Sequence, residues 1–259
     1  MGSRLDKVSV VKVGGATLGK HDTAIEDAVC LQRQGKPIII THGGGNLITE
    51  WLNRQQIPTR FIHGERVTDK VSLEVVISVL AGLVNKELVA AINGLGGRAV
   101  GLCGADGALI QARVKNAELG YVGEVVKVNT ELLKVLFNAG YIPVVAPISI
   151  SVTEGSKLLN INADLVAGEI AAAIGAENLI FLTDVPGIRH QTGDIIPRLS
   201  PEKAQILIDS GVISEGMIPK AKACIRALPN TPITCIIDGR EPHALLKNMK
   251  GEARGTTIG

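Results

Sequence analysis

Two stretches decide the fold of this chain: VSVVKVGG at residues 8–15 and IIITHGGG at residues 38–45. Each joins a run rich in β-branched residues to a glycine cluster, which is typical of a buried strand that ends in a tight loop. Between them, residues 21–34 carry apolar side chains at helical spacing. The sequence therefore predicts a β-loop-α-β unit, with strands at Val8–Val13 and Ile38–Thr41 and a helix between them.

The same alternation continues along the chain. Further strands are expected at Arg98–Leu102, Ala108–Val114, Ile142–Ile148, Leu179–Thr183 and Ile233–Asp238, with an irregular or hairpin segment at Pro58–Thr68 and a hairpin at Gly120–Val128. Helices are expected at Asp69–Ile92, Glu131–Asn138, Asp164–Ile174, Glu202–Asp209 and Ile218–Leu228. Wholly apolar strands are typical of a parallel sheet that is covered on both faces. We therefore expect the α/β class, as a three-layer αβα sandwich around a central, mostly parallel sheet, with ligands at the carboxyl ends of the strands.

The domain organisation predicted from 259 residues is a single domain, residues 1–259, because no linker or internal repeat interrupts the pattern. Within it, Ser149–Ser156 is predicted to be the hinge between an N-terminal lobe of about residues 1–150 and a C-terminal lobe of about residues 151–259.

Composition excludes several functional classes. Lys and Arg number 27 against 25 Asp and Glu, and the chain has one Trp, two Tyr and three Phe. A net charge of +2 with so few aromatic rings argues against a nucleic-acid-binding surface. The longest apolar run, near VVISVLAGLV, is about half the roughly 20 residues of a membrane helix, and the four cysteines form no C-x-x-C pair. We expect a cytoplasmic protein that binds neither nucleic acid nor a membrane.

The glycine clusters are the first candidates for chemistry. Backbone amides at Gly14-Gly15 and Gly43-Gly44-Gly45 have no Cβ in the way, and each cluster leads towards a helix whose positive end favours an anion. Two such loops side by side indicate a phosphate cradle, although glycine also simply permits tight turns. Lys12 lies inside an apolar strand just before the first cluster, and a buried ammonium group implies an anion near its tip.

A P-loop is the competing interpretation of the first loop. Gly14-x-x-x-x-Gly19-Lys20 matches that motif except that His21 replaces the Ser or Thr hydroxyl that would hold Mg²⁺. The P-loop hypothesis explains neither Lys12 nor the second glycine cluster, so it ranks second.

Three charged residues near predicted helix starts are further candidates. Arg66 lies in a loop before the long helix, where it would suit an acidic substrate or simply face solvent. Asp164 opens a helix, where a carboxylate is favourable whatever the function. Lys220 is the unusual one, because a cation at the positive end of a helix is disfavoured, which hints at a ligand. His42 and His63 are interpreted as a loop and a surface histidine without a catalytic role.

Seven short motifs occur in order along the chain: VVKVGG (10–15), THGGGN (41–46), GERVTD (64–69), LNINAD (159–164), LTDVPGI (182–188), GMIPK (216–220) and GTTI (255–258). Together they resemble the amino acid kinase family, in its acetylglutamate kinase branch, over essentially the whole chain. The resemblance implies transfer of the ATP γ-phosphoryl group to the side-chain carboxylate of N-acetyl-L-glutamate, a step of arginine biosynthesis, with Mg²⁺ bridging the ATP phosphates. It also implies that the N-terminal lobe binds substrate and forms the dimer, while the C-terminal lobe binds nucleotide.

By the same resemblance, each site residue acquires a role. The catalytic set is Lys12, Lys220 and Asp164, with the carboxylate holding both lysines, and Gly44, Gly45, Arg66 and Asn160 bind acetylglutamate. Residues implied on the phosphate and nucleotide side are Gly14, Gly15, Gly43, Asp184, Val185, Pro186, Gly187, Ile188, Arg189, Gly216 and Met217. No protein ligand to a metal is implied.

The short N-terminal segment bears on the oligomeric state. Only about seven residues precede the first strand, which leaves no room for the N-terminal helix of the arginine-inhibited hexamers of the family, so we expect an arginine-insensitive homodimer that uses the Asp69–Ile92 helix. The alternatives are a kinase for acetylaminoadipate or for carrier-linked glutamate, and a sensing module that binds an amino acid without turnover.

Overall fold

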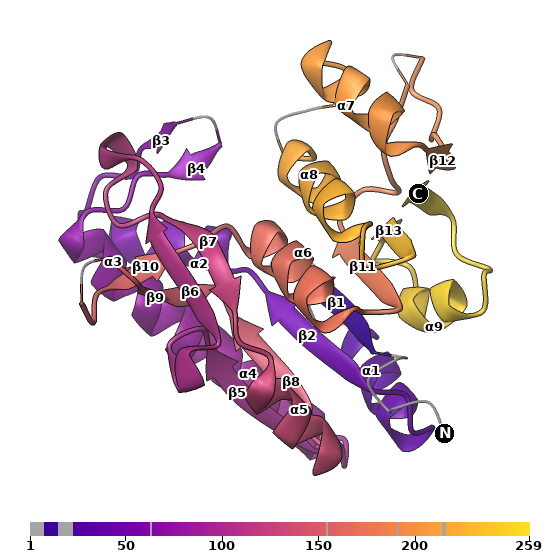
Figure 1. The fold of residues 1–259 in the computed structure, drawn as a ribbon, viewed down its shortest axis with the longest axis horizontal. Helices are drawn as coiled ribbons and strands as arrows, with labels where there is room; N and C mark the ends of the chain where they lie inside the picture. Colours follow the sequence, from indigo (N-terminus) through magenta and orange to yellow (C-terminus); the bar gives the residue numbers. More distant parts are fainter. Residues whose placement is uncertain (1–7, 15–22, 63, 154, 191, 214–215) are drawn as a thin grey trace.

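A central sheet organises the structure (Figure 1). The computed structural model describes residues 8–14, 23–62, 64–153, 155–190, 192–213 and 216–259. Within this described part, eight strands pair in the order β12-β14-β13-β11-β1-β2-β8-β5. They are β12 (Arg198–Leu199), β14 (Gly255–Ile258), β13 (Ile233–Asp238), β11 (Asn178–Thr183), β1 (Ser9–Val13), β2 (Ile38–His42), β8 (Ile142–Ala146) and β5 (Ala99–Cys103). Every neighbouring pair is parallel except β13 with β14.

Helices cover both faces of this sheet because alternate residues of each buried strand point to opposite sides. Val8 and Val10 contribute to one core and Val11 and Val13 to the other. The first core is covered by α5 (Glu131–Asn138), α6 (Ala163–Ile174), α7 (Pro201–Asp209) and α8 (Ile218–Ala227), and Figure 1 shows α6 beside α8. The second is covered by α1 (Ala24–Arg33), α2 (Gly45–Arg54), α9 (Ala244–Met249) and one long helix. The expected three-layer sandwich with a mostly parallel sheet is confirmed.

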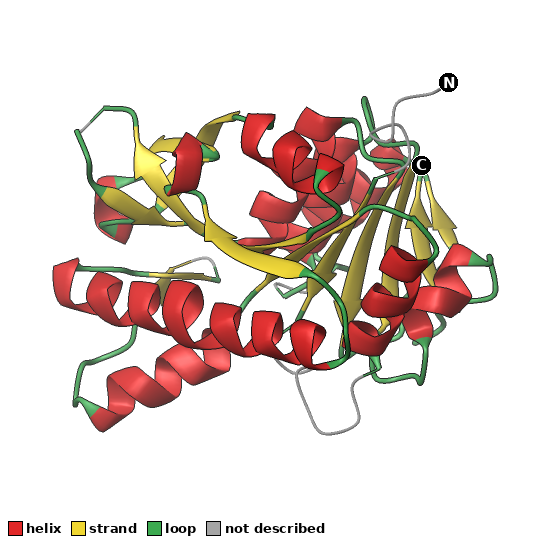
Figure 2. Cartoon of the chain, turned by 90° about the horizontal axis from the view of Figure 1, so that it is seen from below, coloured by secondary structure: helices red, strands yellow, loops and turns green. Residues whose placement is uncertain are grey.

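The long helix runs from Lys70 to Gly94 and is the longest in Figure 2. It comprises α3 (Lys70–Ile77), the π-helical turn η3 (Ser78–Val84) and α4 (Asn85–Gly94). The Asp69 side chain caps it by accepting from the Ser72 amide at 2.7 Å. By length and composition it could span a membrane, but its inner face packs against the strands. Val76, Val79 and Ile92 are fully buried there, so it is a helix of the core.

A second, smaller sheet lies at the end of the molecule away from α7 and α9 (Figure 1). Its order is β10 (Leu158–Asn160), β9 (Ile148–Ser151), β6 (Ile110–Val114) and β7 (Gly123–Val128). The hairpin of β3 (Phe61–Ile62) and β4 (Glu65–Arg66) lies at the same end, as expected for residues 58–68.

Two predicted elements were wrong. Residues 142–148 form two strands in different sheets, β8 and β9, because Pro147 interrupts the strand between them. Residues 120–128 do not form a hairpin of their own; β7 pairs instead with β6. Residues 149–151 and 158–160 pair as the antiparallel strands β9 and β10, so the division into two lobes at this point stays a prediction.

Candidate active site

A buried ion pair joins the first strand to α6. Val8, Val10 and Lys12 share the face of β1 that α6 covers, so the ammonium group of Lys12 points towards the first turn of that helix. There its Nζ lies 2.8 Å from Oδ1 of Asp164, and the two side chains are only 9% and 8% exposed. The helix begins at this point because the Asn162 side chain accepts hydrogen bonds from the backbone amides of Asp164 and Leu165.

A second lysine reaches the same carboxylate. Nζ of Lys220, in the first turn of α8, lies 3.0 Å from Oδ2 of Asp164 and donates to the Gly216 carbonyl at 3.1 Å. Helices α6 and α8 can approach closely because a Cβ at Gly168 would lie only 2.9 Å from the Ala223 carbonyl oxygen. Each oxygen of Asp164 therefore takes one ammonium group, and three distant segments meet at one point.

The electrostatics of this cluster favour a bound anion. Burial opposes ionisation of Asp164, but the charges of Lys12 and Lys220 outweigh it and hold the pKa of the carboxyl below its ordinary value. Two cations and one anion leave a net positive charge. The positive N-terminal ends of α6 and α8 add to it, so the site can neutralise a polyanion such as a triphosphate.

The second glycine loop lines a cavity of about 200 Å³ beside this cluster. Gly43 lies next to Lys12, since a Cβ built on Gly43 would be 3.9 Å from the lysine Nζ. Gly44 rests on the long helix, where a Cβ would come within 2.8 Å of Leu80. Gly45 begins α2, and a Cβ there would meet no atom within 4 Å. The loop therefore offers accessible backbone at the positive end of a helix.

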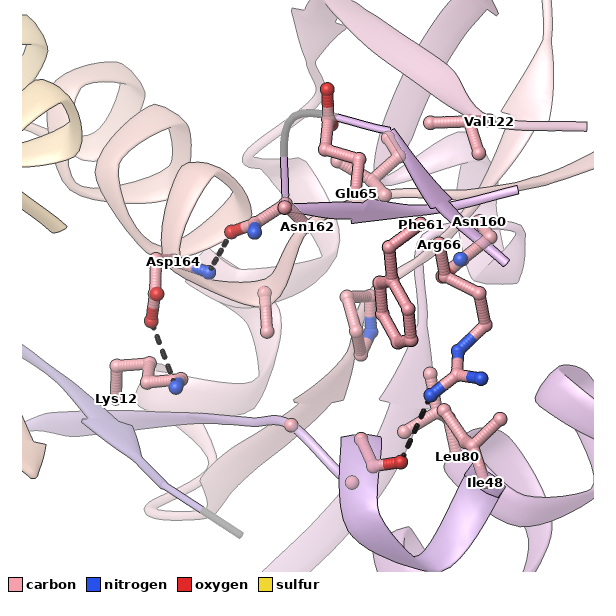
Figure 3. A pocket seen from close by; sticks show the side chains of 17 residues that line it. Lys12, Ile48, Phe61, Glu65, Arg66, Leu80, Val122, Asn160, Asn162 and Asp164 are labelled. Carbon is pink, nitrogen blue, oxygen red and sulfur yellow. Dashed lines mark hydrogen bonds and ion pairs between the residues drawn. The ribbon is translucent and has the colours of Figure 1, made fainter. Parts of the chain in front are cut away.

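Arg66 lies on the side of the cavity away from Lys12 and Asp164 (Figure 3). Its Nη2 donates to the Gly45 carbonyl at 3.1 Å and to Oγ1 of Thr49 at 2.7 Å, and its guanidinium lies 4.8 Å from the centre of the Phe61 ring. Burial lowers the pKa of Arg66 from its ordinary value. These contacts hold the guanidinium on the cavity wall, where its forked donors can bind a carboxylate.

Asn160 supports Arg66 through the backbone. Its Nδ2 donates to Oγ1 of Thr68 at 3.3 Å, and that hydroxyl donates to the Arg66 carbonyl at 2.9 Å. Both Asn160 and Asn162 line the cavity. The four residues predicted to bind acetylglutamate all line one cavity. They are Gly44, Gly45, Arg66 and Asn160.

The segment predicted for the nucleotide follows β11 at the carboxyl edge of the sheet. Asp184 and Arg189 are exposed, whereas Ile188 is 2% exposed and its side chain packs in the core. The Ile188 amide donates to Oγ1 of Thr256 at 2.8 Å. Gly187 has φ +147°, and a Cβ there would lie 2.8 Å from the same oxygen, so only glycine fits.

The remaining nucleotide-side residues have mixed placements. Val185, Pro186 and Met217 are half-buried and Gly216 is exposed. Gly14 directly follows β1, and its amide donates to the Leu182 carbonyl at 3.2 Å. Outside the described residues lie Gly15 of the first glycine cluster, Gly19, Lys20 and His21 of the P-loop comparison, and His63.

A model of the amino acid kinase family matches residues 7–237, most of the chain. The chain belongs to the amino acid kinase family.

Relatives within this family agree over nearly the full length. An acetylglutamate kinase from Dehalococcoides mccartyi is 44% identical over 255 residues, which cover 97% of this chain and 94% of the relative. An acetylglutamate kinase from Nostoc sp. is 50% identical over 245 residues, which cover 92% of this chain and 82% of the relative.

Solved structures share the fold. The structure of smu.665 from Streptococcus mutans has a TM-score of 0.85 at 28% identity, with 98% of both chains covered. Carbamate kinase from Giardia lamblia bound to AMP-PNP has a TM-score of 0.70 at 15% identity, with 97% of this chain and 98% of that chain covered. The expected amino acid kinase and carbamate kinase-like architecture is confirmed.

Two residues that line the cavity were not identified from the sequence, and one histidine behind the cavity was misplaced. Phe61 and Asn162 both line the cavity; Asn162 could have been found, since asparagine two residues before a helical aspartate is a typical cap. The interpretation of His42 as a loop histidine was wrong. It is the last residue of β2 and is fully buried, because its side chain faces the long helix rather than solvent.

Proposed function

We propose that this chain transfers the γ-phosphoryl group of ATP to the side-chain carboxylate of N-acetyl-L-glutamate, giving N-acetylglutamyl 5-phosphate and ADP, for arginine biosynthesis. The family supports a kinase that uses ATP, and relatives at 44% and 50% identity are acetylglutamate kinases. The observation that carries the proposal is the contact of Lys12 and Lys220 with one carboxylate, Asp164, at the edge of the cavity that Arg66 lines.

The acceptor half of the reaction would occupy the cavity. Arg66 would bind the α-carboxylate of acetylglutamate with guanidinium donors that its protein partners leave available, because the group carries five N–H bonds. Asn160 would hold neighbouring polar atoms, and the amides of Gly44 and Gly45 would orient the reacting carboxylate. The cavity volume of about 200 Å³ suits a small amino acid derivative.

The donor half would place the triphosphate at the two lysines. Mg²⁺ would enter with the nucleotide substrate and would neutralise part of the charge of its phosphates. Among the described residues there is no cluster of three or more His, Cys, Asp or Glu side chains that could hold a metal. Asp184 to Arg189, with Gly216 and Met217, would form the nucleotide side.

The chemical step would need no general base. A glutamate side chain with a reference pKa of about 4.3 is already ionised at neutral pH. One of its oxygens would form the new bond to the γ-phosphorus while the bond to the β–γ bridging oxygen breaks and ADP leaves. Lys12 and Lys220 would neutralise charge on the moving group, and the glycine amides would align two anions that repel each other.

The direct test is acetylglutamate-dependent release of ADP from ATP and Mg²⁺, with hydroxylamine added to trap the acyl phosphate as a hydroxamate. We expect both products with acetylglutamate and neither when the acceptor is omitted. Higher turnover of acetylaminoadipate would assign that acceptor instead, and binding without ADP release would assign the sensing module. Loss of activity in Lys20→Ala together with normal activity in Lys12→Ala would contradict the role proposed for Lys12.

We further propose that the protein is a homodimer through the outer face of the long helix. Val71 on that face is 54% exposed, an unusual environment for a large apolar side chain. Light scattering should give twice the mass of one chain for the wild type and the mass of one chain for Val71→Asp. A wild-type monomer, or an intact dimer in Val71→Asp, would contradict this interface.

We also place this enzyme in the cytoplasm. The four cysteines, Cys30, Cys103, Cys224 and Cys235, are free thiols, and a reducing compartment keeps thiols in this state. Fractionation of cells that express the tagged protein would test this placement.

A further inference from the structure

A chain of polar side chains runs from behind the Gly43–Gly45 loop to the surface, where Lys86 is exposed. Nδ1 of His42 lies 3.1 Å from the Gly43 carbonyl oxygen, and its Nε2 lies 3.2 Å from Nδ2 of Asn85. Asn85 is the first residue of α4, and its Oδ1 lies 3.0 Å from Nζ of Lys86. His42 and Asn85 are both fully buried, so each of these polar atoms depends on its protein partner.

The partners fix which atoms carry hydrogen. An ammonium group only donates, so the Asn85 atom that faces Lys86 must be its oxygen. Its Nδ2 then faces the Val144 and Leu102 carbonyls, at 2.9 and 3.3 Å, which only accept. The same Nδ2 faces Nε2 of His42 at 3.2 Å and shares its two hydrogens among these three acceptors. An N–H at Nε2 would point at this donor, so Nε2 is the unprotonated nitrogen and Nδ1 carries the proton. That proton is donated to the Gly43 carbonyl.

We propose that His42 is a positioning residue: held by Asn85 as the neutral Nδ1–H tautomer, it fixes the Gly43 carbonyl and thereby orients the backbone of Gly43–Gly45 towards the phosphoryl-transfer site. The tautomer stands on the contacts alone, whereas its effect on turnover rests on the proposed function. His42 touches neither cavity nor reacting atoms and acts only through the loop.

The long helix supports the loop from the same side. Gly44 rests on the π-helical turn, where a Cβ would lie 2.8 Å from Leu80 and 3.5 Å from Val84. Asn85 follows that turn directly. The loop is therefore fixed twice by neighbouring residues of one helix, through apolar contact at Gly44 and through the Asn85–His42 bridge at Gly43. Such a π-helical turn is often found where a helix serves a functional site.

The surroundings keep the imidazole neutral. Burial lowers the pKa of His42 to about 4, the hydrogen bond to Gly43 opposes this, and the charges of Lys12 and Lys86 reinforce it. An imidazolium would set an N–H group against the Asn85 amide. The Nε2–H tautomer would do the same and leave the Gly43 carbonyl without its donor.

The first experiment reads the tautomer without any assay of activity. Two-bond ¹H–¹⁵N correlation spectra of protein labelled at histidine, with His42→Asn to assign the signal, should show His42 protonated at Nδ1 and unprotonated at Nε2 between pH 6 and 8. A proton at Nε2, or an imidazolium in this range, would overturn the proposal whether or not the protein is an acetylglutamate kinase.

The second experiment separates the two hydrogen bonds of the ring. The amide of His42→Asn occupies the place of Nδ1 and can still donate to Gly43, while Asn85 keeps its two carbonyl partners. The amide of His42→Gln reaches the place of Nε2 and cannot serve Gly43. We expect kcat to fall about tenfold or more in His42→Gln, with both KM values within roughly threefold of wild type, and His42→Asn to recover most of kcat. Equal kcat in wild type and both variants would overturn the positioning role.

Substitutions at two glycines outside the cavity test the Asn85 contact, one as the perturbation and the other as its control. A Cβ at Gly101 in β5 would overlap Oδ1 of Asn85, whereas a Cβ at Gly94 would meet no atom within 4 Å. Gly101→Ala should lower kcat and shift the His42 nitrogen signals, and Gly94→Ala should change neither. Unshifted His42 signals in a folded Gly101→Ala protein would contradict the network. Absence of turnover in the wild type with the expected tautomer would instead reject the proposed function alone.

Discussion

Asp164→Asn is the substitution that separates the charge of the site from its shape. The amide is nearly isosteric but neutral, so the ammonium groups 2.8 and 3.0 Å from the carboxylate lose their counter-ion. At an effective dielectric constant of about 20, each pair attracts by about 6 kcal/mol, and desolvation of the three ions offsets much of this. Removing one partner from a buried ion pair costs about 3–5 kcal/mol. Lys220 is 16% exposed and can turn towards water, so we expect a loss near 3 kcal/mol.

That loss corresponds to a fall in Tm of about 6–12 °C for a chain of this size. Because the folded state lowers the pKa of Asp164, its contribution is complete above the unfolded value of about 3.9 and is lost as pH falls through the folded value. The difference in unfolding free energy between wild type and variant should therefore be constant from pH 5 to 8 and shrink below pH 4. We expect kcat to fall about 10²-fold because the lysines no longer converge, with no rise in KM for ATP because both cations remain.

Asp27→Asn is the matched control. The Asp27 side chain is 1% exposed and pairs with Nδ1 of His243 at 2.7 Å, between α1 and α9 on the opposite face of the sheet. It should lose stability in a denaturant titration while keeping kcat. Wild-type kcat in Asp164→Asn, or an equal fall of kcat in Asp27→Asn, would refute the reasoning.

Three further outcomes are expected. Lys12→Ala and Lys220→Ala should each lower kcat by about 10²- to 10³-fold in steady-state assays, by analogy with loss of one oxyanion donor; a normal value would remove that lysine from the site. Arg66→Lys should raise KM for acetylglutamate about tenfold because the fork is lost, and an unchanged KM would exclude Arg66. Because His42 has a pKa of about 4 when folded and about 6.5 when unfolded, stability should fall by up to about 3 kcal/mol between pH 6.5 and 4; denaturation across this range should show a shallower slope for His42→Asn.

The site residues that could be predicted from the sequence are charged residues in locally unfavourable positions. Lys12 is a charge in an apolar strand, and Lys220 is a cation at the positive end of a helix. Each anomaly is visible within a few residues, and together with the motifs they indicated a shared anion. The carboxylate that holds both, Asp164, is locally unremarkable at a helix start, so the resemblance was needed to connect it to them.

The support behind the glycine loop could not be predicted in this way. Asn85 resembles any polar residue of a helix, and its burial depends on how the long helix crosses β5 and β8. Gly101 did carry a signal, since an isolated glycine in a strand often marks a close approach. Pro147 likewise marked the point where one apolar run divides between two sheets.

The convergence of Lys12, Asp164 and Lys220 also bears on how the protein regains activity after denaturation. Lys12 belongs to the first described strand, and Asp164 and Lys220 are themselves 56 residues apart, so no local segment contains more than one member. Contacts this distant close slowly. During refolding, turnover should return later than the helical circular dichroism signal, and enzyme activity would then report the joining of remote parts of the chain.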